Sequence, residues 1–117
     1  MRIGPARFWP ARFWGARHDT PAQLAIDQGT ANTRALLVDA AGLIHAQASA
    51  PLASANPKPG WAEQSATALW ASVQTVIAAI VAQAGASDIV GIAIAHQREM
   101  LVVCDAVASK PIAPAIR

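Results

Sequence analysis

The sequence is short of cysteine and of charged residues, and it contains no tyrosine. Its single cysteine, Cys104, excludes an internal disulfide and a cysteine-based metal site, and it favours a reducing cytoplasm as the compartment. Charged residues make up 14% of the chain and hydrophobic residues 54%, which argues against a disordered protein. No uninterrupted apolar run approaches the roughly eighteen residues of a membrane span. We therefore expect a soluble globular protein that does not associate with membranes.

Several well-known site patterns are also missing from the sequence. It has neither the glycine-rich Walker phosphate loop nor the Rossmann glycine fingerprint. Its three histidines, His18, His45 and His96, lack the spacing of metal ligands, so no histidine metal site is expected. No serine or second histidine pairs with His96, which weakens its case as a general base. Cys104 lies in an apolar segment, so we expect a buried small side chain rather than a nucleophile.

The positive charge of the chain is concentrated at its amino terminus. The net charge is +2, but four of the nine basic residues lie within residues 1–17, where no acidic residue occurs. The other five basic residues face seven acidic ones, so the rest of the chain is not expected to bind nucleic acid. Residues 1–21 contain a repeated Pro-Ala-Arg-Phe-Trp segment, which we expect to be an unstructured extension. Binding of an anionic surface or of single-stranded nucleic acid is the alternative.

From Ala22 onward the sequence predicts an α/β domain. Apolar runs separated by polar or glycine-bearing turns predict three strands in an antiparallel meander. The first begins near Ala22 and leads into the polar loop, and the other two cover about 33–38 and 43–50. A proline-bearing excursion over 51–59 leads to a helix that begins after Ser65, a preferred N-cap residue, and ends at Gly85 in a left-handed conformation. A strand at 89–95, apolar enough to be buried on both faces, and a further strand at 100–104 complete the order.

Apolar residues recur at three- and four-residue intervals along the predicted helix. They are Leu69, Trp70, Val73, Val76, Ile77, Ile80, Val81 and Ala84. This spacing predicts one continuous apolar stripe, and the meander is the surface available to cover it.

Two polar groups lie at the ends of predicted strands. Asp27-Gln28-Gly29-Thr30 combines a carboxylate, a glycine and a hydroxyl, which can hold a phosphate or its metal ion. An ordinary hairpin turn is an equally good interpretation of these residues taken alone. His96-Gln97-Arg98-Glu99 follows the apolar strand at 89–95. Arg98 and Glu99 can clamp neighbouring hydroxyl groups of a polyol, and an exposed turn without a ligand is the alternative.

Four short motifs occur in order along residues 22–117. They are Asp27-Gln28-Gly29-Thr30, Lys58-Pro59-Gly60-Trp61-Ala62-Glu63, Gln97-Arg98-Glu99 and Lys110-Pro111-Ile112. In this order they resemble the amino-terminal part of the FGGY carbohydrate kinases, and within that family the glycerol kinases most. The resemblance implies a ribonuclease-H-like, actin-type ATPase fold. It also implies ATP and Mg²⁺ as cofactors and a small polyol or sugar as the substrate.

The resemblance assigns roles to individual residues. Asp27 would face the magnesium ion, usually through water, and Arg34 would hold or orient the transferred phosphoryl group. Arg98 and Glu99 match the polyol-binding pair of the family. The loop between the first two strands would contact the nucleotide phosphates through Gly29, Thr30, Ala31 and Asn32. Trp61 is expected to pack, and no role is assigned to Glu63.

The sequence also departs from the family pattern. Ala31 stands where glycerol kinases usually have a second threonine or a serine, and His96 and Met100 flank the Arg-Glu pair where they have other residues. Glycerol is therefore one of several candidate substrates. The catalytic aspartate and the adenine-binding domain of the family would lie beyond Arg117, so no catalytic base is assigned in this chain. We expect an inactive amino-terminal fragment of such a kinase, or alternatively a non-catalytic binding module derived from one.

Overall fold

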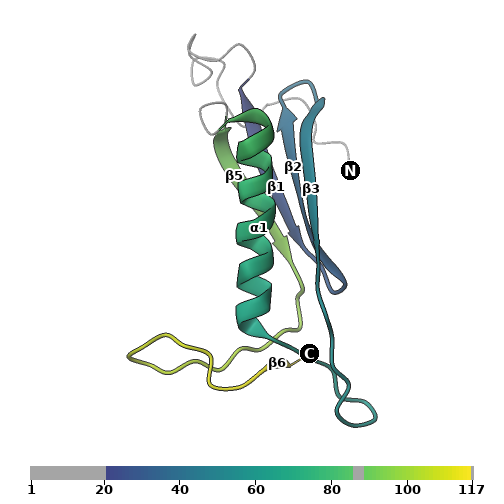
Figure 1. The fold of residues 1–117 in the computed structure, drawn as a ribbon, viewed down its shortest axis with the longest axis vertical. Coiled ribbons are helices and arrows are strands. Elements are labelled where there is room, and N and C mark those ends of the chain that lie inside the picture. The colour runs from purple at the N-terminus through teal and green to yellow at the C-terminus, as the bar shows by residue number, and fades with distance from the viewer. Residues whose placement is uncertain (1–20, 86–88, 117) are drawn as a thin grey trace.

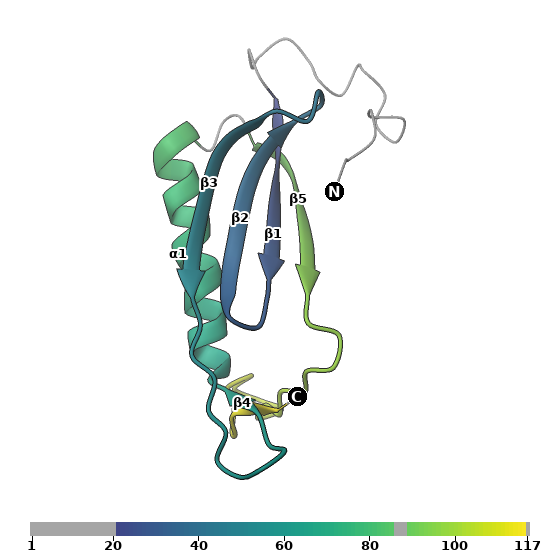
Figure 2. The same ribbon diagram turned by 90° about the vertical axis from the view of Figure 1, so that its right-hand side faces the viewer.

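The computed structural model describes residues 21–85 and 89–116. Its main sheet contains four strands in the order β3-β2-β1-β5, namely β1 (Ala22–Gln28), β2 (Asn32–Asp39), β3 (Ile44–Pro51) and β5 (Ile89–His96). The first three strands pair antiparallel, while β5 runs parallel to β1. The helix α1 (Ala66–Ala84) lies along one face of this sheet (Figures 1 and 2). The described part of the chain is therefore an α/β structure of two layers.

Alternating burial explains why the first strands form a half-covered sheet. Ala22, Leu24 and Ile26 of β1 are buried, and the residues between them are more exposed. The same alternation places Ala35 and Leu37 of β2 on the helix side. In a strand, successive side chains point to opposite faces, so every second side chain lies in the core and the others lie on the opposite face. The antiparallel meander predicted from the sequence is confirmed.

The ends of α1 lie where the sequence predicts them. The Ser65 hydroxyl accepts a hydrogen bond of 3.2 Å from the Ala68 amide, and the Gly85 amide donates to the Val81 carbonyl at 2.8 Å. Gly85 has a φ of 81°, which glycine adopts without strain, but its ψ of 153° is extended rather than left-handed helical. A serine cap and a glycine with positive φ therefore delimit a helix of 19 residues.

One face of α1 packs mainly on β2 and β3. Its buried residues are Leu69, Ser72, Val76 and Ile80, with Val73 and Ile77 partly buried against the core. The prediction that Trp70 belongs to this stripe is wrong, because its side chain is 61% exposed. One residue beyond Leu69 turns the side chain by about 100° around the helix axis, away from the sheet. The apolar stripe is thus narrower than the sequence suggested.

By length and composition α1 would also be able to cross a membrane. Its mean hydropathy is 1.5, and it is the one such helix among residues 21–85 and 89–116. The core helix of a soluble protein can meet the same criteria. In this structure the buried side of α1 lies against the sheet, so the helix serves as the second layer of the fold.

The strand β5 differs from expectation in its burial. It was predicted to be covered on both faces, yet Ile92 is 62% exposed and Ile94 is 68% exposed. Their partners across the parallel ladder, Leu24 and Ile26, are buried beneath α1. The helix covers β2 and β3, and β5 is the outer strand of the described sheet, so its apolar side chains extend past the helix.

The strand predicted at 100–104 is not formed. Leu101 and Cys104 make isolated bridges to Ile116 and Pro111, and the segment folds back on itself. The expected burial of Cys104 is also wrong, since the cysteine is exposed. The next regular strand is instead β6 (Ala115–Ile116), which pairs antiparallel with β4 (Glu63–Gln64) in a second small sheet. Each bridge involves a single residue pair, so no continuous ladder forms along this apolar run.

Candidate kinase half-site at the sheet edge

Both predicted polar groups lie at the same end of the main sheet. The strands β1 and β5 run parallel with Asp27 opposite Ala95 and Gln28 opposite His96. The loop 29–31 therefore leaves β1 beside the turn that leaves β5 (Figure 2). Ligands of parallel α/β sheets bind at such carboxyl ends of strands. The sequence indicated each group but not that β1 and β5 are neighbours.

The loop 29–31 is held closely by backbone hydrogen bonds. The Gly29 amide donates to the Asn32 carbonyl at 3.0 Å, and the Leu52 amide donates to the Ala31 carbonyl at 2.9 Å. A Cβ atom on Gly29 would lie 3.0 Å from the Asn32 carbonyl oxygen. The φ angle of Gly29 is not positive, unlike those of Gly42, Gly60 and Gly85. Glycine is thus needed here for close backbone approach rather than for a left-handed conformation.

Three of the predicted nucleotide-site residues share one face of the sheet. Asp27 lies opposite Arg34 in the antiparallel register, and Asn32 precedes Arg34 by two residues on the same strand. Because Ile26 and Thr33 point to the helix side, these three residues lie on the other face. Both charged side chains are exposed, and opposite charges directly across a ladder attract. The face therefore offers one carboxylate and one guanidinium to a ligand.

The predicted substrate pair lies in a turn directly after β5. Arg98 and Glu99 are both exposed there. His96 is also exposed, and its Nδ1 atom lies 2.7 Å from the carbonyl oxygen of Gln97. Both members of the pair are accessible to a small polar molecule.

Two glutamines that sequence reasoning left without a role connect these groups. Gln97 donates from Nε2 to the Gly29 carbonyl at 3.0 Å and to Oε1 of Gln64 at 3.2 Å. Its own Oε1 accepts a bond of 3.2 Å from the Thr30 hydroxyl. Gln64 donates to the Thr30 carbonyl at 2.8 Å. Each glutamine lies beside a recognisable signal, Gln97 before the Arg-Glu pair and Gln64 before the N-cap serine.

The donor set of this edge suits magnesium better than a metal that needs a protein cage. Within residues 21–85 and 89–116 there is no group of three or more histidine, cysteine, aspartate or glutamate side chains that could hold a metal. Magnesium is commonly held by one or two carboxylates, with water and substrate phosphates as its other ligands. The exposed carboxylate of Asp27 meets that requirement.

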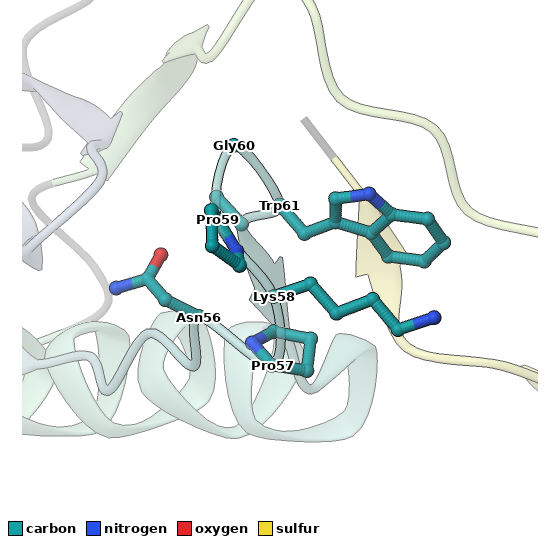
Figure 3. Close-up of a pocket in the computed structure, with 7 residues that line it drawn as sticks. Asn56, Pro57, Lys58, Pro59, Gly60 and Trp61 are labelled. Atoms are coloured by element: carbon teal, nitrogen blue, oxygen red, sulfur yellow. The ribbon is translucent and has the colours of Figure 1, made fainter.

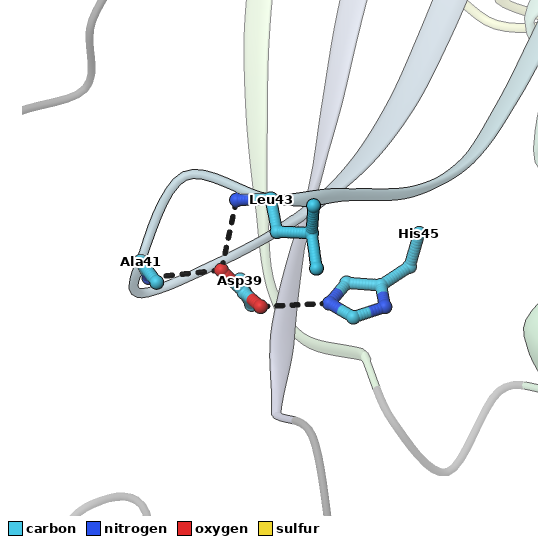
Figure 4. A network of polar contacts seen from close by, with 4 residues as sticks. All are labelled: Asp39, Ala41, Leu43 and His45. Atoms are coloured by element: carbon cyan, nitrogen blue, oxygen red, sulfur yellow. Dashed lines mark hydrogen bonds and ion pairs between the residues drawn. The ribbon is translucent and has the colours of Figure 1, made fainter.

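The resolved pKa shifts belong to Asp39 and Asp105, neither of which is a predicted ligand-binding residue. Asp39, at the opposite end of β2, accepts hydrogen bonds from His45, Leu43 and Ala41 that hold its carboxyl pKa below the ordinary value (Figure 4). The amides of Ala108 and Val107 lower the pKa of Asp105 in the same way. Both carboxylates close turns, so neither shift indicates acid–base chemistry at the predicted site.

An open hollow of about 520 Å³ lies in the segment before α1. Residues 56–62 line it, and none of the predicted ligand-binding residues takes part (Figure 3). The Lys58 ammonium lies 5.0 Å from the centre of the Trp61 ring, and Trp61 is 53% exposed. The expected packing role of Trp61 is thus limited to this local contact. A hollow formed by one continuous loop lacks the convergent groups of a ligand site.

Comparison with known proteins decides the family. Residues 22–117 match the model of the amino-terminal domain of the FGGY family of carbohydrate kinases. The chain belongs to the FGGY carbohydrate kinases. This confirms the resemblance drawn from the four motifs. The structural relatives confirm the ribonuclease-H-like α/β fold that the resemblance implied.

The FGGY relatives are named for different substrates. Apulose kinase from Pectobacterium atrosepticum is 38% identical over 97 residues, which are 83% of this chain and 20% of that protein. Glycerol kinase from Bacillus subtilis is 41% identical over 95 residues, which are 80% of this chain and 19% of that protein. The xylulose kinase structure from Rhodospirillum rubrum superposes with a TM-score of 0.76 at 31% identity, covering 82% of this chain and 20% of the kinase. The chain thus spans about a fifth of the length of its FGGY relatives.

Proposed function

We propose that this FGGY chain forms one wall of an ATP-dependent polyol or sugar kinase site. The observation that carries the proposal is the parallel register of β1 and β5, which puts Gln28 opposite His96. This register brings the predicted phosphate loop and the predicted substrate pair to one edge of the sheet. A site that joins two substrates requires such convergence.

In the proposed site the nucleotide half lies on β1 and β2. Asp27 would help to hold Mg²⁺, and Arg34 would orient the phosphoryl group that is transferred. Gly29 lets the loop backbone approach closely, while Thr30, Ala31 and Asn32 contact the phosphates. Magnesium, when bound, neutralises charge on the phosphates. The contribution of these residues is positioning and electrostatic stabilisation, which is what phosphoryl transfer demands of a protein.

The substrate half of the proposed site is the turn after β5. Arg98 donates from a planar guanidinium and Glu99 accepts, so together they can hold adjacent hydroxyl groups. The named substrates of the relatives include glycerol, apulose and xylulose. These molecules share neighbouring hydroxyls, and we therefore propose a small polyol or sugar without choosing among them. A cytoplasmic location, which the single cysteine favours, is part of the same proposal.

We expect no kinase turnover from the 117-residue chain alone. One wall of a site cannot supply the converging groups that stabilise a phosphoryl-transfer transition state. The measurement is ADP release in the presence of MgATP and glycerol, D-xylulose or apulose, with a full-length FGGY kinase as the positive control. Turnover above the no-protein background would contradict this expectation.

Binding of MgATP tests the proposed site without requiring turnover. NMR spectra of the isotope-labelled chain titrated with MgATP should show chemical-shift changes confined to residues near the loop 29–31. Asp27→Asn should weaken MgATP binding by about tenfold or more, because it removes the charge that faces the metal's water shell. It should change the affinity for metal-free ATP much less. Asp105→Asn is the matched control, since it neutralises a carboxylate that closes the 105–108 turn and has no assigned ligand role.

The competing function is a non-catalytic binding module. It would be favoured if the chain binds neither MgATP nor any of the polyols at millimolar concentration, yet forms a complex of defined stoichiometry with another protein. Equal MgATP affinity of the wild type and of Asp27→Asn would also count against the proposed nucleotide site.

A further inference from the structure

The two glutamines at the sheet edge form a bridge between parts of the chain that are far apart in sequence. Gln97 follows β5, and Gln64 lies in β4 directly before the helix cap. Together they contact the carbonyl oxygens of Gly29 and Thr30, the Thr30 hydroxyl and each other. We call Gln64 and Gln97 the glutamine bridge. It links the loop 29–31 to the start of α1 and to the turn that carries Arg98 and Glu99.

The partners determine how each amide is oriented. An amide nitrogen donates two hydrogen bonds and an amide oxygen only accepts. Both bonds from Nε2 of Gln97 go to acceptors, the Gly29 carbonyl and Oε1 of Gln64, while its Oε1 faces the Thr30 hydroxyl. Reversing this amide would place an oxygen against two other oxygens. Glutamate in this position would meet the same repulsion, so the bridge requires an amide.

Burial makes the bridge costly to break. Gln64 is only 3% exposed, and its Nε2 donates to the Thr30 carbonyl at 2.8 Å and to the Ala53 carbonyl at 3.5 Å. Among the described residues, no buried side-chain nitrogen or oxygen lacks a hydrogen-bond partner. Removing the amide of Gln97 would leave Oε1 of Gln64 without its donor, whereas the Gly29 carbonyl would keep the bond of 2.8 Å from Nε2 of Gln28. Leaving a buried polar group without a partner costs more folding free energy than the net contribution of the hydrogen bond that is lost.

We propose that Gln97 is a positioning residue that, directly and through Gln64, sets the conformation of the phosphate loop 29–31 and ties it to the Arg98–Glu99 turn. The proposal rests on the proposed kinase half-site for its functional meaning. Gln97 itself is not assigned a contact with a ligand. Its side chain holds the loop, while its backbone leads directly into the substrate pair, so one residue fixes the spacing of the two halves.

The test measures amide hydrogen exchange in the unliganded 117-residue chain. The reporters are the Gly29 amide, bonded to Asn32, and the Leu52 amide, bonded to Ala31. In Gln97→Ala both should exchange about tenfold faster, because local opening of the loop then breaks fewer hydrogen bonds. Gln97→Met retains volume without polar atoms, and Gln97→Glu retains an acceptor but no donor. Both should behave like Gln97→Ala.

A matched control comes from the other end of the helix. Gln83 also donates its side-chain amide to a distant backbone carbonyl, that of Gln47 at 3.1 Å. Gln83→Ala should leave exchange at Gly29 and Leu52 unchanged. Protection of either reporter in Gln97→Met at the wild-type level would show that volume suffices and would overturn the proposal. Faster exchange throughout the α1 core amides, alongside the loop, would also overturn it by showing a global effect.

A second readout separates this proposal from the proposed function. MgATP titration of wild type and Gln97→Met should show about tenfold weaker binding in the variant. If the wild type fails to bind MgATP while the exchange pattern is as expected, the kinase half-site is wrong and the loop-positioning role stands. If the wild type binds and the variant binds equally, the positioning role is wrong and the half-site stands.

Discussion

Asp39 stabilises the turn between β2 and β3 through one carboxylate (Figure 4). Its Oδ1 accepts bonds from the amides of Ala41 at 2.8 Å and Leu43 at 3.0 Å, and its Oδ2 lies 2.8 Å from Nε2 of His45. The hydrogen bond from His45 is the main cause that lowers the carboxyl pKa, followed by the Leu43 amide. An acceptor of this kind is lost when the carboxylate is protonated.

Because of the Asp39 turn, the free energy of unfolding should depend on pH in the acidic range. Its folded-state pKa lies below the ordinary value of 3.8, so its contribution is complete above pH 3.8 and is lost as the pH falls through the lower folded pKa. Urea denaturation of the wild type and of Asp39→Asn should therefore differ above pH 3.8 and converge below it. A difference that stays constant down to pH 2 would contradict this assignment.

At the scale of elements, a buried pair of hydroxyls joins the sheet to the helix. Thr33 of β2 is fully buried, and its Oγ1 lies 2.6 Å from Oγ of Ser72 on α1. The Ser72 hydroxyl donates to the Leu69 carbonyl at 2.7 Å. A hydroxyl carries one hydrogen, so Thr33 must be the donor in the pair. The hydrogen bond therefore runs from the Thr33 hydroxyl of β2 to the Ser72 hydroxyl of α1, and it holds the helix against the strand.

Substitutions at this pair should have unequal costs. Ser72→Ala leaves the buried Thr33 donor without its acceptor and should cost about 1–3 kcal/mol of unfolding free energy. Thr33→Val removes that donor and should cost less, because Ser72 keeps its bond to Leu69. The loss of unfolding free energy in the double variant should be smaller than the sum of the losses in the two single variants. Chemical denaturation of all four proteins measures this cycle, and strict additivity would rule out the interaction.

At the scale of the whole molecule, the described sheet ends on an apolar strand. Ile92 and Ile94 of β5 are exposed on the helix side, and Trp70 of α1 is exposed as well. An outer strand also presents unpaired backbone groups that can recruit another chain. The uncovered face of β5 is therefore the part of the structure most prone to self-association.

The purified chain should accordingly associate with itself, and Ile94→Lys should reduce the association. A lysine there adds a charge in the middle of the exposed apolar face, which would have to be desolvated on contact. Size-exclusion chromatography with light scattering over a range of concentrations gives the measurement. Gln74→Lys adds the same charge at an exposed polar position of α1 and should leave the assembly unchanged. Equal assembly of Ile94→Lys and wild type would exclude this face as the contact.

Residues 1–20 lie outside the described structure, so the expectation of an unstructured extension over 1–21 stays a prediction. The same holds for the proposed boundary between this extension and the domain, and for the ligand roles of Asp27, Arg34, Arg98 and Glu99. The placement of these four residues is known from the structure.

Local sequence signals were sufficient wherever the cause was local. The Ser65 cap and Gly85 marked the ends of α1, apolar runs between turns marked β1 and β2, and the four motifs marked the family. Burial of β5 was mispredicted because it depends on how far a distant helix extends over the sheet, and burial of Trp70 because it depends on which side of α1 faces the sheet. The absence of a strand at 100–104 depends likewise on distant residues, because Leu101 and Cys104 pair with Ile116 and Pro111 only through single bridges.

The amino-acid order alone therefore specified the family and the elements β1, β2, β3, α1 and β5. It also predicted the individual groups of the proposed half-site. The tertiary fold specified how those groups meet at the Asp27-Gln28-Gly29-Thr30 end of the sheet. The parallel pairing of β1 with β5 joins segments about seventy residues apart, and the bonds from Gln97 to Gly29 and Thr30 span the same separation. No periodicity encodes a pairing at that distance, because it arises only when α1 crosses the sheet and returns the chain beside β1.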